Sequence, residues 1–488
     1  MTGPADDPRR RLRRAVYLLL IALSTGSIVG RTLAVNSVDY IRLEKHLKEK
    51  EKRRDWQKQR PFLSANDRSR WCTVRALVEH GTYAIDDIVG QPNWDTIDMV
   101  KHDDLGREAP GADEGRLYSS KPPLLATLMA GEYWLINQWT GATLATHPYS
   151  IGRGMIVTFN LVPLVIFFLV VARLVERFGT TDWGKLYVMA AATFGTFLST
   201  FAVAINNHLP AAVCAAITLD AALRIWYDGE RRLRWFAVAG FFAAFAAANE
   251  LPALAFFSAV AVGLMWKSPR ATLIAFVPGA LVVAAASLGT NWLAHHSLSP
   301  PYAHRHEGDN WYDYQFKREG KVRDSYWSKA KDRAPIDQGE PERAVYAFHV
   351  LIGHHGIFSL TPIWLLSFGG MFWLCLRREP DQRAMGLLLL SVSLVTIAFY
   401  LLYVGEGDRN YGGMTSGFRW GFWFAPLWLV GMLPVCDAAA GRRWSRGVAV
   451  VFLALSVASA SYPTWNPWTH PWLLDFLLDN QWVRLGSG

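Results

Sequence analysis

Two carboxylates in this chain have contexts suited to general-base chemistry. Asp67 lies in the polar phrase NDRSRW, directly before a helix-forming run, and Glu250 interrupts the apolar block from Trp235 to Trp266. An acid inside a membrane segment is a functional candidate because burying its charge in lipid is costly. Each residue also has a plain structural role. Asp67 suits the N-cap of the following helix, and Glu250 would be a solvated turn residue if its block turns at the membrane surface.

Two cations have contexts suited to binding a phosphate group. Lys121 precedes a Pro-Pro pair that restricts its backbone. Arg419 follows Gly412, Gly413 and Gly417, and glycines let a ligand approach the backbone closely. Charged donors of this kind stabilise a departing phosphate. The structural alternatives are a lysine that extends from the membrane interface toward water and an arginine that anchors a helix end.

Three histidines are candidate ligands. His354 and His355, in LIGHHGIFSLTP, could bind a divalent metal together with Asp67 or Glu250, because imidazole and carboxylate are common metal ligands. Adjacent histidines rarely point at one ion, so the presence and identity of a metal stay open. His208, in INNHLP, is either a ligand or hydrogen-bond donor, or a turn residue. The four cysteines show no CxxC spacing, so we expect neither a disulfide framework nor a thiolate metal site.

The composition indicates a membrane protein that would have to position these side chains between apolar helices. Of 488 residues, 51% are hydrophobic and 13% aromatic, with 22 tryptophans. The formal net charge is +9, but the positive residues cluster beside apolar runs. This clustering indicates membrane orientation rather than nucleic-acid binding.

Nine apolar runs have the length of about 20 residues that a helix needs to cross the hydrocarbon core. The block from Trp235 to Trp266 is too long for one span, so we expect it to form a hairpin of two helices. The sequence therefore predicts an all-α polytopic membrane protein with about eleven transmembrane helices. The nine runs are 15–35, 153–173, 185–205, 208–226, 271–293, 357–376, 384–404, 419–437 and 447–462.

The orientation follows from the positive-inside rule. With a cytoplasmic N-terminus, read as an uncleaved signal anchor, the cytoplasmic connections are all basic: 173–185, 224–234, 267–270, 377–383 and 442–446. The stretch 122–138 is also apolar, but counting it as a span would place these connections outside. It starts with two prolines and contains Glu132, so we expect it to lie at the outer membrane surface as a juxtamembrane helix.

This topology places the candidate residues on the extracytoplasmic side of a cell membrane. The first outer loop, 36–152, carries juxtamembrane helices, and the second large loop is 294–356. All thirteen histidines fall on this side. We expect one transmembrane domain, 1–462, followed by a short extracytoplasmic tail, 463–488, whose aromatic residues suit the membrane interface.

The layout and several short motifs resemble the GT-C superfamily of integral-membrane glycosyltransferases. The matching text is NDRSRW, RALVEHGTY, KPPL and YGGMTSGFRWGFWFAPLW. The protein O-mannosyltransferase and aminoarabinose-transferase-like families are the most similar members. The resemblance implies transfer of a sugar from a polyprenyl-phosphate donor to a protein, lipid or glycan acceptor.

The resemblance also implies roles for individual residues. Asp67 matches the first acidic position of the family's outer-loop motif when Arg70 and Trp71 match its basic and aromatic residues. A shift of one residue would place Asn66 there instead. One carboxylate suffices as a base, because a phosphate leaves without an acid. Arg70 and Arg153 would join Lys121, Arg419, His208, His354 and His355 on the substrate side, and Glu250 would supply a second acid that INNHLP lacks.

We therefore predict a membrane glycosyltransferase with Asp67 as the base, and the resemblance implies inversion of configuration at the sugar. The sequence identifies no cofactor, and it leaves open whether a divalent metal binds. The alternative is a transporter or flippase of a lipid-linked intermediate, which would be expected to show paired broken helices in two related halves. A third possibility is a noncatalytic membrane scaffold. Glu250 and the glycine-rich loop before Arg419 would then have no functional role.

Overall fold

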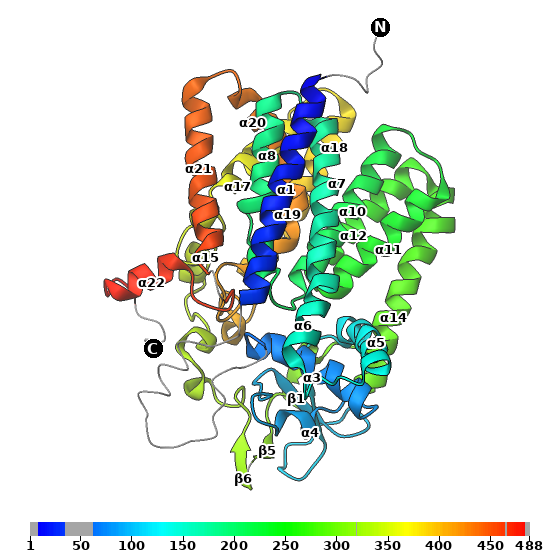
Figure 1. The fold of residues 1–488 in the computed structure, drawn as a ribbon, viewed down its shortest axis with the longest axis vertical. Helices are drawn as coiled ribbons and strands as arrows, with labels where there is room; N and C mark the ends of the chain where they lie inside the picture. Colours follow the sequence, from blue (N-terminus) through cyan, green and yellow to red (C-terminus); the bar gives the residue numbers. More distant parts are fainter. Residues whose placement is uncertain (1–7, 35–61, 319, 464–465, 484–488) are drawn as a thin grey trace.

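A computed structural model of the chain describes residues 8–34, 62–318, 320–463 and 466–483. The described chain is mostly helical and forms two parts, a bundle of upright helices and a smaller outer domain at one end of it (Figure 1). The first part of the predicted outer loop, 36–61, lies outside the described residues. The chain enters the bundle at the end opposite the outer domain, so α1 (Pro8–Ala34) runs toward that domain.

The bundle consists of helices that coincide with the predicted apolar runs. Besides α1 its upright members are α7 (Val162–Phe178), α8 (Asp182–Phe194), α10 (His208–Tyr227), α11 (Leu233–Asn249), α12 (Leu254–Lys267), α14 (Val277–His295), α17 (Ile363–Cys375), α18 (Pro380–Leu402), α19 (Ala425–Gly431), α20 (Leu433–Ala439) and α21 (Arg443–Ser461). Shorter pieces extend or join them: α6 (Pro148–Ile156), η1 (Val157–Leu161), α9 (Phe197–Phe201), η2 (Leu251–Ala253), α13 (Pro269–Ala271), η3 (Thr272–Phe276), α16 (Ile357–Leu360) and η8 (Arg419–Phe424).

The predicted number of about eleven spans is not confirmed. Among the described residues, six helical segments are long and apolar enough to cross a membrane, and a bent pair, Arg419–Gly431 with Leu433–Ala439, makes up to seven. Three further apolar segments have only 10–17 residues: Leu233–Asn249, Leu251–Lys267 and Ile363–Cys375. The chain is therefore a multi-pass membrane protein. The six are Pro8–Ala34, Pro148–Phe178, His208–Tyr227, Pro269–His295, Pro380–Leu402 and Arg443–Ser461.

Several predicted spans are interrupted. The run 185–205 is not one helix, because α8 ends at Phe194 and α9 begins only at Phe197. The run 357–376 breaks between α16 and α17, where Pro362 cannot donate a backbone hydrogen bond. The run 419–437 bends by 46° between α19 and α20. The hairpin expected at 235–266 is present as α11 and α12, with Glu250 between them.

In the part of the chain that the structure describes, the outer domain combines short helices with three two-stranded antiparallel sheets. In the first sheet Met99 pairs with Ser119 and His102 with Arg116. Its helices are α3 (Ala65–Glu79), α4 (Asp86–Val89) and α5 (Pro123–Thr140), with η4 (Pro301–Ala303), η5 (Ala330–Asp332), η6 (Pro335–Gln338) and η7 (Glu406–Asp408). Two further helices, α15 (Arg343–Leu351) and α22 (Trp472–Asp479), pack against the core of the bundle. The strands of the outer domain are β1 (Met99–His102), β2 (Arg116–Ser119), β3 (Arg305–His306), β4 (Asp309–Asn310), β5 (Gln315–Arg318) and β6 (Lys321–Asp324).

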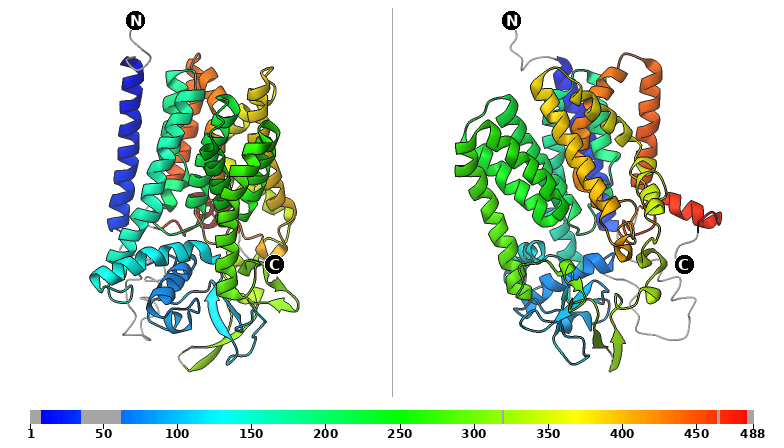
Figure 2. Two further views of the ribbon diagram at one scale, coloured as in Figure 1. Left: turned by 90° about the vertical axis from the view of Figure 1, so that its right-hand side faces the viewer. Right: turned by 180° about the vertical axis from the view of Figure 1, so that it is seen from behind.

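Helix α5, expected at the membrane surface, lies at the junction of the two parts. It runs crosswise to the bundle axis (Figure 2). Its buried face includes Leu125, Met129 and Tyr133, which pack with Trp71 of α3 in the core of the outer domain. This course agrees with the expectation that 122–138 does not cross the membrane.

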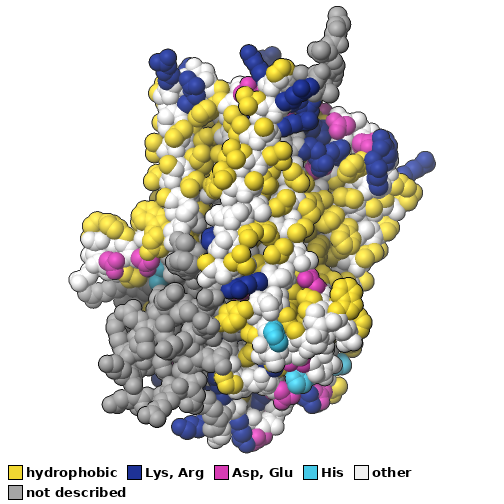
Figure 3. Space-filling view, viewed as in Figure 1, with side chains coloured by type: hydrophobic (Ala, Val, Ile, Leu, Met, Phe, Trp, Pro, Cys, Tyr) yellow, Lys and Arg dark blue, Asp and Glu magenta, His cyan; other side chains and the backbone are white. Residues whose placement is uncertain are grey.

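Charged side chains are distributed unevenly along the bundle. On the face shown in Figure 3, lysine and arginine side chains gather at the end where α1 begins, hydrophobic side chains cover the middle, and histidines lie on the outer domain. A large core of buried apolar residues fills the bundle, and two smaller cores fill the outer domain. The basic connections predicted to be cytoplasmic thus share one end of the molecule (Figure 1).

Candidate functional site

Asp67 lies in the first turn of α3 but is not its N-cap. Ser64 caps the helix, and its hydroxyl accepts a hydrogen bond from the backbone N–H of Asp67 (3.0 Å). Oδ1 of Asp67 accepts hydrogen bonds from Nε1 of Trp71 (2.9 Å) and from the backbone N–H of Ile205 (3.2 Å). Oδ2 accepts one longer hydrogen bond, from the N–H of Leu63 (3.3 Å). The carboxylate therefore joins α3 to the turn before α10 through Oδ1, while Oδ2 is less engaged.

The surroundings of Asp67 favour its protonated form. The residue is 2% exposed, and burial raises the pKa of its carboxyl to about 6, although Arg70 opposes the rise. Asp67 also lines a cavity of about 30 Å³ with Arg153. Nη2 of Arg153 donates to the carbonyl of Leu33 at the end of α1 (2.9 Å). Arg153 therefore lies beside Asp67.

Arg70 is held one turn further along α3. Its Nη1 donates to Oδ1 of Asn66 (2.6 Å), and its Nε and Nη2 both donate to Oδ1 of Asn207 (3.0 and 2.7 Å). Nδ2 of Asn207 in turn donates to the carbonyl of Asn249 (3.1 Å). Arg70 thus connects the outer domain to two turns of the bundle. Asn66, the alternative to Asp67 in the acidic position, is engaged as the partner of Arg70.

His208 and Glu250 meet at these turns. Nδ1 of His208, the first residue of α10, lies 2.6 Å from Oε1 of Glu250. Nε2 of His208 lies 3.5 Å from Nη1 of Arg419. Both His208 and Glu250 are buried, at 5% and 7% exposure. Glu250 is thus neither a solvated turn residue nor lipid-facing, since it lies in a row of polar groups with His208 and Arg419.

The glycine-rich loop positions Arg419. Nε of Arg419 donates to the carbonyl of Gly412 (2.8 Å), and Gly412 has a φ of +96°, which a side chain would strain. A Cβ at Gly417 would lie 2.8 Å from the ring of Phe197. The guanidinium carbon of Arg419 lies 4.9 Å from the ring centroid of Trp468. The C-terminal tail, expected at the membrane interface, therefore contributes an aromatic cover to this arginine.

Lys121 is paired with a carboxylate that sequence reasoning did not single out. Its Nζ donates to Oδ1 of Asp98 (2.8 Å). Asp98 directly precedes β1, and the pairing of Met99 with Ser119 brings it beside Lys121. Neither IDMVKH nor RLYSSK alternates strictly between apolar and polar residues, so no local pattern in the sequence marks this pair.

These residues form one electrostatic unit, here named the junction cluster. Burial lowers the pKa of Lys121 to about 8, with Arg70 and Arg419 acting in the same direction against Asp98. Burial also lowers the pKa of Arg70 to about 10. Burial acts to raise the pKa of Asp98, but Lys121, Arg419 and Arg70 hold it below its usual value. The junction cluster consists of Arg70, Asp98, Lys121, His208, Glu250 and Arg419.

Three cations and two carboxylates in a buried setting make the junction cluster a candidate anion site. Mutual repulsion of the cations disfavours their charged forms, and an added anion would relieve it. A phosphate oxygen accepts charge-assisted hydrogen bonds from both lysine and arginine. The cluster joins α3 and the β1–β2 hairpin of the outer domain to the beginning of α10, the turn between α11 and α12, and η8 of the bundle.

His354 and His355 lie in a separate group with His349, His470 and Tyr411. Nδ1 of His354 lies 2.6 Å from Nδ1 of His355, and the His355 ring stacks on Tyr411 at 5.1 Å. Burial lowers the pKa of His354 to about 3. Among the described residues, no group of three or more histidine, cysteine or acidic side chains is arranged to hold a metal ion. The group is a packed aromatic cluster.

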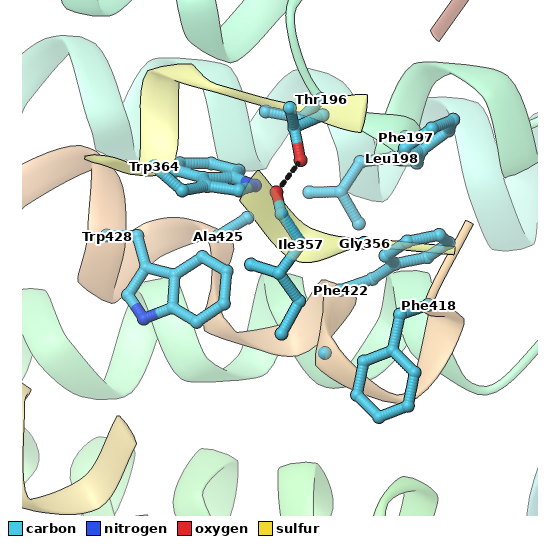
Figure 4. A pocket seen from close by; sticks show the side chains of 12 residues that line it. Thr196, Phe197, Leu198, Gly356, Ile357, Trp364, Phe418, Phe422, Ala425 and Trp428 are labelled. Carbon is cyan, nitrogen blue, oxygen red and sulfur yellow. Dashed lines mark hydrogen bonds between the residues drawn. The ribbon is translucent and has the colours of Figure 1, made fainter. Parts of the chain in front are cut away.

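A small apolar cavity of about 30 Å³ lies below the arginine loop. Figure 4 shows Phe197, Leu198, Trp364, Phe422 and Trp428 around it. Two helix interruptions border this cavity, at Thr196 and at Thr361, whose hydroxyl donates to the carbonyl of Ile357 (2.7 Å). The interruptions thus place apolar side chains directly beneath the loop that holds Arg419.

Comparison with solved structures yields a likeness in fold. No protein-family model matches this chain, and no curated protein matches it. It is similar to the archaeal oligosaccharyltransferase AglB from Archaeoglobus fulgidus, in complex with an inhibitory peptide and a dolichol-phosphate, with a TM-score of 0.43 and 12% identity. The match covers 97% of this chain and 56% of that one. The function is therefore argued from the residues of the site.

Proposed function

We propose that this protein is a membrane glycosyltransferase of GT-C type that transfers a sugar from a polyprenyl-phosphate donor to a protein, lipid or glycan acceptor. The observation that carries the proposal is the junction cluster, where three cations meet at the seam between an apolar bundle and a polar domain. A polyprenyl-phosphate sugar has the same two parts as this seam, because its tail is apolar and its phosphate and sugar are polar.

The cations bind the donor phosphate in this proposal. The positive charges of Lys121 and Arg419 repel each other, so a phosphate bound at the cluster would relieve that repulsion. Arg419 has a fixed fork of donors that suits phosphate oxygens. Negative charge grows on the phosphate as the glycosidic bond breaks, and preorganised cations stabilise that charge more strongly in the transition state than in the ground state.

Asp67 is the proposed base. Its Oδ2, which accepts a single longer hydrogen bond, takes the proton from the acceptor hydroxyl. The acceptor oxygen then attacks the anomeric carbon, the bond from that carbon to the phosphate oxygen breaks, and polyprenyl phosphate leaves with the electron pair. Attack from the face opposite the phosphate inverts the configuration. A pKa of about 6 lets the carboxylate be ionised and basic near neutral pH.

Glu250 and His208 position Arg419 in this mechanism. Glu250 lies 2.6 Å from Nδ1 of His208, whose other ring nitrogen faces Arg419 at 3.5 Å. A carboxylate at one ring nitrogen orients the imidazole and sets the role of the other nitrogen. We place the N-terminus in the cytoplasm and the junction cluster on the extracytoplasmic side, because the basic connections lie at the opposite end of the bundle.

The phosphate role can be tested with Lys121→Met. Membranes containing the variant are incubated with labelled polyprenyl-phosphate sugars, and transfer is measured over a range of donor concentrations. The expected result is about tenfold or greater loss of kcat/KM, as for the loss of one charge-assisted contact. Lys321→Met is the matched control, because Lys321 is exposed on β6. Equal losses in both variants would contradict the phosphate role.

A further inference from the structure

A large cavity opens at the end of the bundle opposite the junction cluster. It has a volume of about 690 Å³ and lies among the ends of α7, α10, α17 and α20 and the beginning of α18. This volume is within the range of about 300–1,000 Å³ typical of small-molecule sites. The cavity takes no part in the proposed sugar transfer, so an inference about it stands independently of that function.

The walls of the cavity combine apolar and aromatic side chains with polar ones. Phe178 and Tyr227 pack edge to face, with ring centroids 5.3 Å apart. The other apolar lining residues are Trp373, Leu374, Met385, Val430, Leu433, Pro434 and Ala438. Hydrocarbon chains in the cavity would remove the apolar part of this lining from water.

Most charged side chains that line the cavity already have hydrogen-bond partners within the protein. Arg177 donates to Asp228 (2.7 Å) and its guanidinium lies over the ring of Phe178 (4.8 Å). The carboxylate of Asp437 accepts hydrogen bonds from the N–H of Thr180 (2.8 Å) and from the hydroxyl and N–H of Thr181 (2.6 and 2.9 Å). These groups hold the helix ends together and are engaged without a ligand.

Arg377 is the exception in the lining. Its guanidinium carbon lies 5.2 Å from the ring of Trp373, and among the described residues it forms no ion pair with a carboxylate. Gln382 lines the cavity in the first turn of α18, a helix of 23 residues whose N-terminus has no side-chain cap. An arginine and an amide can both donate hydrogen bonds to a phosphate group. Asp381, the acid of the same first turn, accepts a hydrogen bond from Nε1 of Trp226 (2.8 Å).

We propose that this cavity binds a phospholipid, held through its phosphate. The phosphate lies at Arg377 and Gln382, beside the beginning of α18. The upper parts of the acyl chains lie against the aromatic wall that includes Phe178 and Trp373. Basic pockets between transmembrane helices are known to bind lipid headgroups. The bound lipid fills the space between α17, α18 and α20 and stabilises that end of the bundle.

The test measures lipid binding by the purified full chain. Phosphatidylglycerol is added to protein in detergent, and bound lipid is counted by native mass spectrometry for wild type, Arg377→Ala, Gln382→Ala and Arg378→Ala. Arg378 is the matched control, because it is the adjacent arginine, is exposed as Arg377 is, and does not line the cavity. The expected result is about tenfold weaker binding of one lipid in Arg377→Ala, a smaller loss in Gln382→Ala, and wild-type binding in Arg378→Ala.

Two further probes separate a phospholipid from its parts. Glycerol phosphate at the same concentration is expected not to displace the lipid, and diacylglycerol is expected not to occupy the site. Displacement by glycerol phosphate would overturn the lipid assignment, and equal binding of diacylglycerol would overturn recognition of the phosphate. Equal binding by Arg377→Ala and Arg378→Ala would overturn the proposed site. Size-exclusion profiles confirm that each variant is folded.

Discussion

Asp67 is a buried acid and Asp98 a half-buried acid of the outer domain, and their neighbours differ. Asp98 is paired with Lys121 at 2.8 Å, and nearby cations hold its pKa below the usual value. Asp67 has no ion pair at that distance among the described residues, and burial raises its pKa to about 6. A carboxylate held ionised by cations is a weak base. Asp67 is therefore better suited than Asp98 to accept a proton.

The raised pKa of Asp67 predicts the pH dependence of sugar transfer. A base acts only when it is deprotonated, so kcat/KM should fall as the pH drops through about 6 rather than through the usual aspartate value. The measurement is the rate of transfer from a labelled polyprenyl-phosphate sugar between pH 4.5 and 8. A rate that stays constant down to about pH 4.5 would contradict a base with this pKa.

The contacts of Arg419 predict that a lysine at this position would not support full activity. Its Nε donates to Gly412, and its guanidinium lies over Trp468. A lysine keeps the charge but cannot hold both contacts and a phosphate. Arg419→Lys is therefore expected to lower kcat/KM for the donor about tenfold or more. The control is Arg323→Lys on exposed β6, and full activity of Arg419→Lys would show that charge alone is sufficient.

The candidate residues could be predicted from sequence better than their partners. Arg70, Lys121, His208, Glu250 and Arg419 were singled out, and the structure brings them together. Their types and local contexts carry that information. Asp98 was missed because its role depends on the pairing of two strands, which is set by contacts between distant segments. The pairing of His208 with Glu250 likewise depends on how two turns meet.

At the level of elements, the breaks in the apolar helices support the arginine loop. α8 ends at Phe194, and the short α9 brings Phe197 against Gly417. Hydropathy did not reveal this break, because the residues on both sides of it are apolar. The composition of a segment indicates whether it is buried away from water. The position of a helix break depends on backbone hydrogen bonds and on the packing of neighbouring helices.

Gly417 provides a test of this packing. A Cβ there would lie 2.8 Å from the ring of Phe197, so Gly417→Ala should destabilise the protein by about 1–3 kcal/mol, as overpacking does. The measurement is the midpoint of thermal unfolding in detergent. Gly405→Ala is the control, since a Cβ at Gly405 has no atom within 4 Å. Equal midpoints for the two variants would contradict the tight contact.

At the level of the whole molecule, the positions of apolar segments were predictable but their number as membrane spans was not. Every predicted apolar run coincides with helix, yet only six to seven described segments have the length and composition of a span. Helices such as α11, α12 and α17 are shorter than the predicted runs because prolines and polar turns end them. A hydropathy pattern does not show where these helices begin and end.

The predicted orientation can be checked by cysteine labelling in sealed membrane vesicles. Gln138 lies near the end of α5, beside the outer domain, and Arg378 lies at the opposite end of the bundle. A membrane-impermeant maleimide is expected to label Gln138→Cys from the extracytoplasmic side only and Arg378→Cys from the cytoplasmic side only. Labelling of both variants from one side would contradict a bundle that separates the two positions.

The most direct test of the proposed function is sugar transfer with and without the Asp67 carboxylate. Membranes containing wild type, Asp67→Asn or Asp104→Asn are given labelled polyprenyl-phosphate sugars, and label in acceptors is counted. Asp104 is an exposed acid of the same domain. Transfer is expected from wild type and Asp104→Asn, with a loss of about 10²-fold or more in Asp67→Asn at unchanged thermal stability. Equal transfer by Asp67→Asn, or none by wild type from any donor, would contradict the proposal.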